Sequence, residues 1–405
     1  MARPAGNRAR WRGSAPLSGL GQFRGRIAAL GGVIVILLAA GTWVALTHAS
    51  AQSTRSRGGN STRHAKVVAQ ARAVPLTVVS VTPAQGVRFA NGTAPVKVQF
   101  SAPLAAGSPM PWIRPAVPGT WTADGKGGVE FVPARGFQQW THVQVVIPAG
   151  VRSASGQRLA QATTVHFRVG GFAPARLPEL LAQLGYLPVS WIPSAGQVAP
   201  SLGSAAGQLS AAYAPPAGTY AWQPGYPFRL RAFWAGGSPS GLIVHGAIMA
   251  FESDHGLAMD GVAGAQVWQS LLHAAAAHQV NTHGYSYALA DQHYPEKLTV
   301  WHNGRVILRT PANTGIPVAP TAVGTDPVYL RYQSQIMKGT NPDGSKYADP
   351  VAWVAYFRAG EAVHYFPRYS YGSQQSLGCV ELPWGQAKYV WPYLTYGTLV
   401  TVTPN

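Results

Sequence analysis

The chain has 405 residues but only one cysteine and few charged side chains. A lone thiol cannot form a disulfide within the chain, so the folded domains must be stabilised by packing rather than by covalent cross-links. Charged residues make up 11% of the sequence and only 13 are acidic, whereas glycine (46) and proline (33) are abundant. This composition favours short strands separated by turns over long helices.

The formal charge of +18 is distributed unevenly along the sequence. Eleven of the 31 lysines and arginines lie in the first 75 residues, where there is no aspartate or glutamate. The rest of the chain has 20 basic and 13 acidic residues and no basic run of the kind that follows nucleic-acid phosphates. We therefore expect no nucleic-acid partner. The mildly positive remainder suits an anionic surface such as a cell wall or lipid headgroups, and it is equally compatible with solubility alone.

A single long apolar run without charge covers residues 27–46 and predicts a transmembrane helix. Residues 1–26 are basic and predict a cytoplasmic tail, so the rest of the chain lies outside the membrane. The expected location is the cell membrane, with one span and an extracytoplasmic body facing the cell wall. The small residues 49–51 also allow a cleaved signal peptide, although the apolar core exceeds the usual length. Residues 47–74 predict a flexible linker.

Short alternating segments fill residues 75–170 and predict an all-β sandwich. The strands are expected at 77–81, 96–100, 128–132, 142–147 and 164–169. The stretches Phe100-Ser101-Ala102-Pro103 and Phe131-Val132-Pro133 resemble those of bacterial immunoglobulin-like (Ig-like) domains. We expect three tryptophans to pack in the core or between the sheets rather than to form a ligand platform: Trp112, Trp121 and Trp140.

Residues 172–283 carry helical patterns, beginning with leucines spaced three and four apart from Leu177 to Leu184. Further helices are expected at 247–255 and 265–273. The second and third helices and the turn between them resemble the small helical peptidoglycan-binding domain through Ala250-Phe251-Glu252, Gly256-Leu257, Asp260-Gly261, Gly264 and Trp268 to Leu271. That resemblance implies contact with cell-wall glycan, whereas the alternative is a spacer of three helices. An insertion, residues 188–240, separates the first and second helices.

Residues 285–405 predict a second β-rich domain. Strands are expected at 286–290, 297–301, 305–309, 327–332, 352–357 and 397–402. Asn303-Gly304, between the second and third of these, is the strongest hairpin-turn signal in the chain.

The only cysteine, Cys379, lies near the end of this domain, fifteen residues after His364. A thiolate attacks carbonyl groups, and an imidazole nearby can remove the thiol proton. A glycine-containing turn next to the cysteine can direct backbone N–H groups at the same point and so form an oxyanion site. The alternative is an inert cysteine that packs as a small apolar residue.

A series of motifs then resembles the L,D-transpeptidase (YkuD-type) catalytic domain over about residues 285–405. The motifs are Leu298-Thr299-Val300-Trp301, Asn303-Gly304, Asn313-Thr314-Gly315, Pro320-Thr321, Gly324-Thr325, Val363-His364 and Ser376-Leu377-Gly378-Cys379-Val380. The resemblance implies that Cys379 is the nucleophile and His364 its base. It also implies that Ser376 and Gly378 frame the turn before the nucleophile. The backbone N–H groups near Leu377, Gly378 and Cys379 would form the oxyanion hole, and the main chain of Tyr365 would orient the imidazole.

Two positions depart from the pattern of that family. Leu377 stands where a histidine is usual, and Glu381 stands where an arginine or asparagine is usual. The first change keeps the backbone N–H, whereas the second alters the charge beside the substrate path.

The sequence thus predicts a multidomain, mainly β protein with a transmembrane helix, an Ig-like sandwich, a small helical domain and an L,D-transpeptidase domain. The implied reaction forms a cysteine thioester with a peptidoglycan tetrapeptide stem, releases terminal D-alanine and transfers the acyl group to an acceptor stem. The alternatives are an L,D-carboxypeptidase that uses water, and a non-catalytic scaffold that binds the wall. No cofactor or metal is expected, because the histidines show no ligand spacing.

Overall fold

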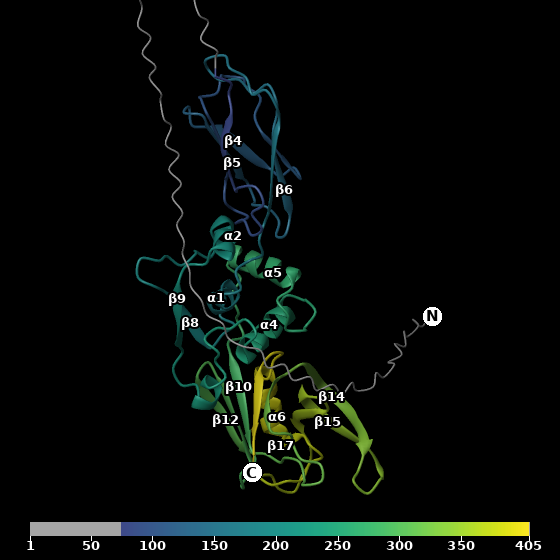
Figure 1. Ribbon diagram of the computed structural model, residues 1–405. Helices are drawn as coiled ribbons and strands as arrows, with labels where there is room; N and C mark the ends of the chain where they lie inside the picture. Colours follow the sequence, from purple (N-terminus) through teal and green to yellow (C-terminus); the bar gives the residue numbers. More distant parts are fainter. Residues whose placement is uncertain (1–73, 405) are drawn as a thin grey trace, which may run out of the picture. The chain divides into compact units, whose positions relative to one another are not determined.

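The computed structural model describes residues 74–404. The predicted tail, transmembrane helix and nearly all of the linker lie outside this range. Within residues 74–404, no helix combines the length and apolar character needed to span a membrane. Residues 74–404 belong to one compact unit, whose strands and helices are drawn in Figure 1.

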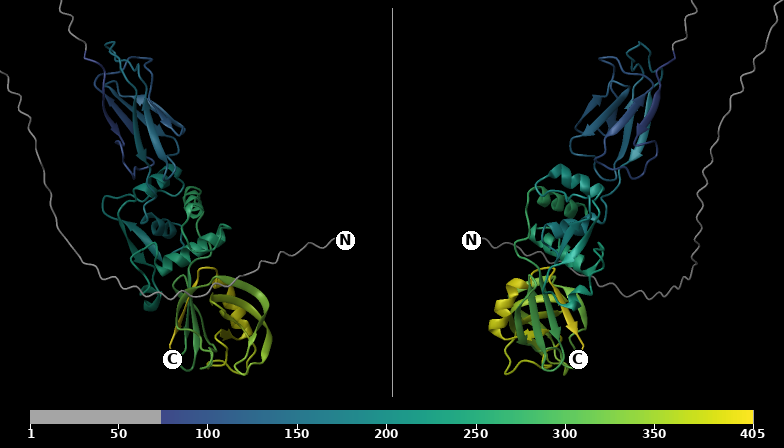
Figure 2. Two further views of the ribbon diagram at one scale, coloured as in Figure 1. Left: turned by 45° about the vertical axis from the view of Figure 1, so that its right-hand side comes forward. Right: turned by 90° about the vertical axis from the view of Figure 1, so that its left-hand side faces the viewer.

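The first part of the described chain is a sandwich of two antiparallel sheets (Figure 2). One sheet has the order β1-β2-β5-β4 and the other β3-β6-β7. Their strands are β1 Val78–Thr82, β2 Val96–Phe100, β3 Trp112–Arg114, β4 Gly119–Ala123, β5 Gly128–Pro133, β6 His142–Ile147 and β7 Thr163–Arg168. In β2, Val96, Val98 and Phe100 are buried whereas Lys97 is exposed, so alternation fixes the inner face.

The strands β3 and β4 were not predicted, and two of the three tryptophans depart from expectation. Trp112 and Trp140 are 38% and 50% exposed, so the prediction that they pack in the core is wrong. Each ring instead lies under an arginine, Arg114 at 4.4 Å and Arg168 at 5.2 Å. A guanidinium gains energy over an indole face while it stays in water, which explains why these rings remain at the surface.

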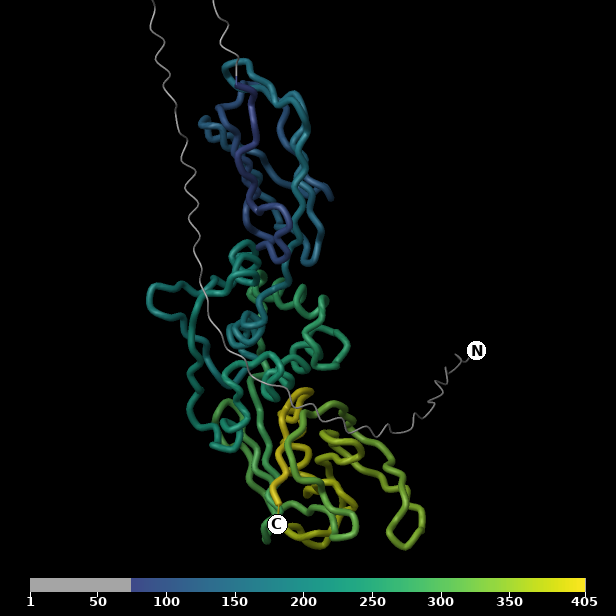
Figure 3. Tube along the Cα trace, in the orientation of Figure 1, coloured from purple at the N-terminus to yellow at the C-terminus, as the bar shows by residue number. Residues whose placement is uncertain are grey.

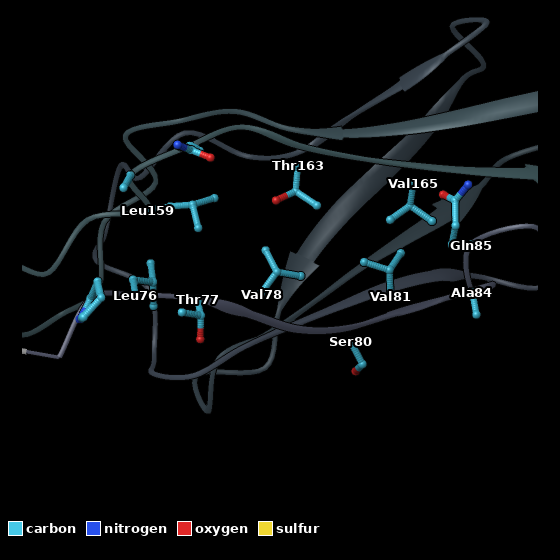
Figure 4. Close-up of a pocket in the computed structure, with 13 residues that line it drawn as sticks. Leu76, Thr77, Val78, Ser80, Val81, Ala84, Gln85, Leu159, Thr163 and Val165 are labelled. Atoms are coloured by element: carbon cyan, nitrogen blue, oxygen red, sulfur yellow. The ribbon is translucent and has the colours of Figure 1, made fainter.

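The Ig-like sandwich has an open groove of about 600 Å³ between its edge strands β1 and β7 (Figure 4). Val78 and Val81 point toward Thr163 and Val165 across this groove, whereas Ser80 points away. No lining residue carries a charge or a nucleophilic thiol. The groove is therefore not the place where the predicted chemistry would occur.

The next part of the chain is mainly helical and contains α1 Arg176–Gln183, α2 Ala205–Tyr213, α3 Phe228–Arg231, α4 Leu242–Asp254 and α5 Ala265–Ala276. Three of these correspond to predicted helices, although α4 begins five residues earlier than expected. The insertion 188–240 is ordered: it supplies α2, α3 and a hairpin of β8 Val189–Pro193 with β9 Gly218–Trp222. Leu180 and Phe251 from the helices share one apolar cluster with Tyr287 of the next domain, so the two parts are packed together.

The C-terminal domain contains two sheets that face a common core. The first has the order β12-β11-β10-β18-β13 and the second β14-β15-β16-β17. Their bounds are β10 Ser286–Asp291, β11 Lys297–His302, β12 Arg305–Pro311, β13 Gly324–Pro327, β14 Leu330–Thr340, β15 Lys346–Arg358, β16 Glu361–Tyr365, β17 Val380–Leu382 and β18 Leu399–Thr403. A short helix, α6 Trp384–Val390, follows β17. Val300 and Val400 of the first sheet share a cluster with Val363 and Val380 of the second.

The predicted turn at Asn303-Gly304 is confirmed. It joins β11 to β12, and both residues have positive φ, 48° and 74°. Positive φ at both central residues matches the twist of a two-residue hairpin.

Two features of the second sheet were not anticipated. The strands expected at 327–332 and 352–357 are parts of a long hairpin, β14–β15, which extends well beyond the turns around it (Figure 3). The short strands β16, which carries His364, and β17, which begins directly after Cys379, were not predicted at all. β17 is only three residues long and buried on both faces, so it lacks the alternation that identifies a strand in a sequence.

Candidate active site

His364 and Cys379 are brought together by the parallel pairing of β16 with β17. In this pairing His364 lies opposite Glu381, and Val363 opposite Val380. Paired residues share a face of a sheet, and so do residues two apart on one strand. Because Cys379 immediately precedes β17, its side chain lies on the same face as those of Glu381 and His364.

The turn before Cys379 is held by the buried side chain of Ser376. Its Oγ accepts the N–H of Gly378 at 3.2 Å and donates to the carbonyl of Cys379 at 2.6 Å. Gly378 has φ +108°, yet a Cβ there would meet only ordinary contacts at 3.7 Å. The glycine is therefore required by backbone conformation rather than by lack of space.

The motif Asn313-Thr314-Gly315 supports this turn from both ends. Asn313 exchanges backbone hydrogen bonds with Glu381 at 2.9 and 3.0 Å, and the carbonyl of Thr314 accepts the N–H of Ser376 at 2.9 Å. A Cβ at Gly315 would lie 2.2 Å from the carbonyl oxygen of Ala319, so the segment can approach this closely only with glycine.

The imidazole of His364 is oriented by the main chain. Its Nδ1 lies 2.9 Å from the carbonyl oxygen of Tyr365. A carbonyl can only accept, so Nδ1 carries the proton and Nε2 is left as the acceptor in the neutral ring. Burial lowers the pKa of His364 below its usual 6.5, although the Tyr365 carbonyl and the charge of Glu381 act in the opposite direction. The ring is therefore neutral at neutral pH and has a free basic nitrogen.

The thiol of Cys379 is also neutral at rest. Burial raises the pKa of Cys379 to about 12, and the negative charges of Glu381 and Glu361 add to this effect. The N–H of Ala362 acts in the opposite direction. The Sγ lies 3.8 Å from the carbonyl oxygen of Gly360. These two pKa shifts favour a neutral thiol and a neutral imidazole at rest over a thiolate–imidazolium ion pair.

Both side chains line one cavity of about 450 Å³. This volume lies within the range of small-molecule and peptide sites. The walls come from three segments: the β14–β15 hairpin, the strand β16 with the loop that follows it, and the turn before β17. Leu377, which replaces the usual histidine, is 37% exposed and lines the same cavity.

The predicted oxyanion donors differ in their availability. The N–H of Gly378 is already donated to Ser376. Those of Leu377 and Cys379 donate to no side chain or loop carbonyl within residues 74–404. Only these two remain as candidates to receive negative charge in the cavity.

Glu381 is paired with an arginine that the sequence did not single out. Arg368 donates from Nε and Nη2 to the two carboxylate oxygens at 2.8 Å each, and Nη2 also donates to the carbonyl of Gln375 at 2.8 Å. The unusual acid beside the nucleophile is therefore compensated by a cation of this same chain. Arg368 lies between His364 and Cys379 in the sequence. The only sequence signal for it was Glu381, because an acid so near the nucleophile indicates a basic partner.

The aromatic residues between base and nucleophile separate into different environments. Phe366 lines the cavity, whereas Tyr369 is fully exposed. The Tyr365 ring packs against Trp384 at 4.9 Å, so only its carbonyl serves the site. Tyr371 donates its hydroxyl to the carbonyl of Phe366 at 2.6 Å.

Across the described range, no three side chains of histidine, cysteine, aspartate or glutamate converge in a way that suits a metal ion. The cavity offers a thiol, an imidazole, two backbone donors and an arginine–carboxylate pair. The β14–β15 hairpin adds Lys338, Asp349 and two tyrosines, Tyr347 and Tyr356.

Comparison with family models gives two matches. Residues 286–402 match the L,D-transpeptidase catalytic domain (YkuD), and residues 72–169 match a bacterial Ig-like domain (Big_5). The comparison with curated proteins finds no match.

Solved structures resemble the chain at low identity. An L,D-transpeptidase from Mycobacterium smegmatis is 14% identical, with a TM-score of 0.28, over 82% of this chain and 100% of that one. L,D-transpeptidase 3 from Mycobacterium tuberculosis is 15% identical, with a TM-score of 0.28, over 81% and 98%. The catalytic domain of an E. faecium L,D-transpeptidase is 27% identical, with a TM-score of 0.27, over 29% of this chain and 96% of that one. At such TM-scores these likenesses support no further conclusion.

Two of the three resemblances noted in the sequence, those to the L,D-transpeptidase and Ig-like domains, are confirmed by the family models. The resemblance of the helical part to a peptidoglycan-binding domain stays a prediction. The chain thus combines an Ig-like domain with a C-terminal domain similar to the L,D-transpeptidase catalytic family.

Proposed function

We propose that this protein forms peptidoglycan cross-links through an acyl-enzyme on Cys379. The observation that carries the proposal is the hydrogen bond from Nδ1 of His364 to the Tyr365 carbonyl, which leaves Nε2 as a base in the cavity that Cys379 also lines. The match of residues 286–402 to the L,D-transpeptidase family supports a peptidoglycan stem peptide as the substrate.

In the first half-reaction, Nε2 of His364 takes the thiol proton as Sγ attacks the carbonyl carbon of the third residue in a tetrapeptide stem. The carbonyl oxygen becomes negative and faces the N–H groups of Leu377 and Cys379. The bond to the terminal D-alanine then breaks, and the imidazolium returns the proton to the leaving amine. A thioester remains on Cys379, and D-alanine departs.

In the second half-reaction, an amine of a neighbouring stem attacks the thioester carbonyl. His364 takes the amine proton and returns it to the departing sulfur. The new amide joins two stems, and its formation uses the energy of the amide broken first, so no nucleotide is required. Water in place of the amine would give a carboxypeptidase.

The purified full-length chain, incubated with tetrapeptide-stem muropeptides and analysed by mass spectrometry, tests this proposal. We expect release of D-alanine and formation of cross-linked dimers, both lost in Cys379→Ala. Trimmed monomers without dimers would show that water is the acceptor. Unchanged muropeptides with retained wall binding would favour a scaffold and refute the enzyme.

Acylation offers an independent test of the thiol. A carbapenem presents a strained carbonyl, and we expect it to form a covalent adduct on Cys379, seen by intact mass. Cys379→Ala is the control. A folded wild-type protein without an adduct would contradict a competent nucleophile.

We further propose that residues 27–46 anchor the chain in the membrane with the catalytic domain facing the wall. The charge-free apolar run supports this, together with the basic residues before it. Alkaline extraction of membranes tests it, because an anchored protein stays in the pellet.

We also propose that the helical part contacts the cell wall. A pull-down with purified cell wall tests this, and we expect deletion of the surface loop 256–264 to weaken binding.

A further inference from the structure

A second cavity, of about 730 Å³, lies where the Ig-like domain meets the helical part. Its walls come from the β5–β6 loop, from residues 171–172, from α2 of the insertion, and from α5 with the residue at 263. None of the lining residues belongs to the C-terminal domain. The cavity is therefore separate from the one that holds Cys379, and its volume and its place between two domains are typical of a ligand site.

The walls of this cavity are joined by aromatic contacts. Tyr213 of α2 donates its hydroxyl to the carbonyl of Phe137 at 3.0 Å, and its ring packs edge-on against Phe172 with the centroids 4.9 Å apart. Phe172 also packs edge-on against Trp268 of α5, at 5.3 Å. These contacts connect the β5–β6 loop, the insertion and α5, so the cavity is a defined part of the fold.

Trp140, at the end of the β5–β6 loop, is held at the cavity in a strained conformation. Its φ is 64°, which a residue as bulky as tryptophan rarely adopts, and its side chain is 50% exposed. A Cβ at Gly171 would lie 2.3 Å from the indole, so only glycine allows the ring to occupy this position. Backbone outliers of this kind concentrate at functional sites, where the strain is offset by the surrounding contacts.

The polar lining of the cavity is mostly uncharged. It includes Gln138, Gln139 and Gln269, whereas Arg135 is the only charged residue. Gln139 uses its Oε1 to accept the N–H of Phe172 at 3.0 Å, which leaves its amino group as a donor. Gln138 and Gln269 are exposed, and their side chains make no hydrogen bond within residues 74–404. An amide side chain both donates and accepts hydrogen bonds, so these groups suit a ligand rich in hydroxyl and amide groups.

We propose that this cavity binds a glycan of N-acetylated sugars, with pyranose rings against the indoles of Trp140 and Trp268 and the acetamido and hydroxyl groups on the glutamines. A pyranose has an apolar face of C–H groups and a polar rim, which matches aromatic rings flanked by amides. An apolar peptide would leave the amides without partners, and a polyanion would meet only one cation. The inference rests on the proposed wall contact of the helical part, to which it gives a site and a ligand class, and not on the chemistry of Cys379.

Calorimetric titration of the full-length Cys379→Ala protein tests the inference without turnover. The probes are a pentamer of N-acetylglucosamine, a glucose pentamer with the same linkage, and wall glycan strands from which the stem peptides have been removed. We expect the N-acetylglucosamine pentamer and the wall glycan to bind. The glucose pentamer should bind about tenfold more weakly, because it lacks the acetamido groups that pair with the glutamines. Binding of the N-acetylglucosamine pentamer without wall glycan would assign the site to another N-acetylated polymer.

Variants in the Cys379→Ala background locate the binding. Trp140→Ala should weaken the affinity for the N-acetylglucosamine pentamer about tenfold or more, as is usual when an aromatic anchor is removed. Gln269→Ala should weaken it about threefold to tenfold, and it changes an exposed side chain that supports no packing around Gly171. Trp112→Ala is the matched control, because Trp112 belongs to the same Ig-like domain, is 38% exposed and lies outside the cavity. Thermal unfolding of each variant verifies that it is folded.

Three results would each overturn the inference: no binding of either N-acetylated probe, equal affinity for the glucose pentamer, or the same loss in Trp112→Ala as in Trp140→Ala. If no sugar probe binds while the chain still sediments with purified cell wall, the proposed wall contact stands and the inference fails. If the sugars bind but deletion of loop 256–264 leaves sedimentation unchanged, the inference stands and the role of that loop fails.

Discussion

Arg368 binds both carboxylate oxygens of Glu381, each at 2.8 Å, directly beside the nucleophile. The pair replaces the uncharged or basic residue that the family pattern places at position 381. A two-point contact of this kind keeps the net charge near the thiol close to zero, because the guanidinium offsets the carboxylate. Removing the carboxylate and removing the guanidinium should therefore change the reactivity of Cys379 in opposite directions.

Glu381→Gln should make Cys379 more reactive, because the negative charge of Glu381 contributes to raising the pKa of the thiol. Arg368→Gln should make it less reactive, because Glu381 then loses its compensating cation. We expect the rate of Cys379 alkylation by iodoacetamide at pH 8 to rise roughly three- to tenfold in Glu381→Gln and to fall by a similar factor in Arg368→Gln.

Glu361→Gln serves as a second test of the same field, since Glu361 also raises the pKa of Cys379 and should behave like Glu381→Gln. Changes in the same direction for Glu381→Gln and Arg368→Gln would mean that the pair acts through loop structure and not through charge.

The pH profile should distinguish a neutral resting pair from an ion pair. Burial lowers the pKa of His364 below 6.5 and raises that of Cys379 to about 12. The base is active when unprotonated, so kcat/KM for D-alanine release should rise through a pKa below 6.5 and then stay level to about pH 9. Alkylation of the thiol should be slow at pH 7 and increase about tenfold per pH unit above pH 8.

A thiolate–imidazolium pair would behave differently. It would give a plateau of rapid alkylation at neutral pH and a decline of activity as the imidazolium loses its proton. Either result would contradict the neutral pair.

Ser376→Ala should weaken the turn that presents Cys379. The buried hydroxyl makes two hydrogen bonds across the turn, to the N–H of Gly378 and the carbonyl of Cys379. Removing it should lower the free energy of unfolding by about 1–3 kcal/mol and reduce kcat more than KM, because the turn also aims the backbone donors. Denaturant unfolding and steady-state kinetics measure both effects.

Ser370→Ala is the matched control, since Ser370 is exposed and its hydroxyl makes no hydrogen bond within the described residues. Equal effects of the two substitutions would show that the Ser376 hydroxyl has no special role.

Glu252 should make the stability of the chain dependent on pH. This carboxyl is fully buried in α4, accepts the N–H of Gly261 at 2.8 Å, and has a pKa raised to about 7, mainly by burial. The folded state therefore binds more protons than the unfolded state between about pH 4.5 and 7, and its stability falls as pH rises through this window. Glu252→Gln should remove this fall and be more stable than wild type by roughly 1–3 kcal/mol at pH 8, with little difference at pH 4.5.

Thermal unfolding at pH 4.5, 6 and 8 measures the effect. Glu130→Gln, which changes a more exposed glutamate of the Ig-like domain, is the control. A parallel loss of stability with pH in wild type and Glu252→Gln would place the titrating group elsewhere.

Much of the architecture follows from local sequence. Alternation along Val96–Phe100 fixes the inner face of a strand, the leucines from Leu177 to Leu184 give a helix, and Asn303-Gly304 specifies a tight hairpin. These patterns are readable because each depends on neighbours a few residues away.

The sequence alone determined that one thiol and one upstream imidazole were candidates for chemistry, because no other cysteine exists in the chain. The tertiary structure decided how they are used. The register of β16 with β17 places Cys379, His364 and Glu381 on one face, and the pairing of Arg368 with Glu381 neutralises a charge that the sequence left open. The β14–β15 hairpin brings Asp349 to the same cavity. Strands as short as β17 have no periodicity of their own, and charge partners far apart in the chain meet only after folding, so neither could be inferred before the fold was known.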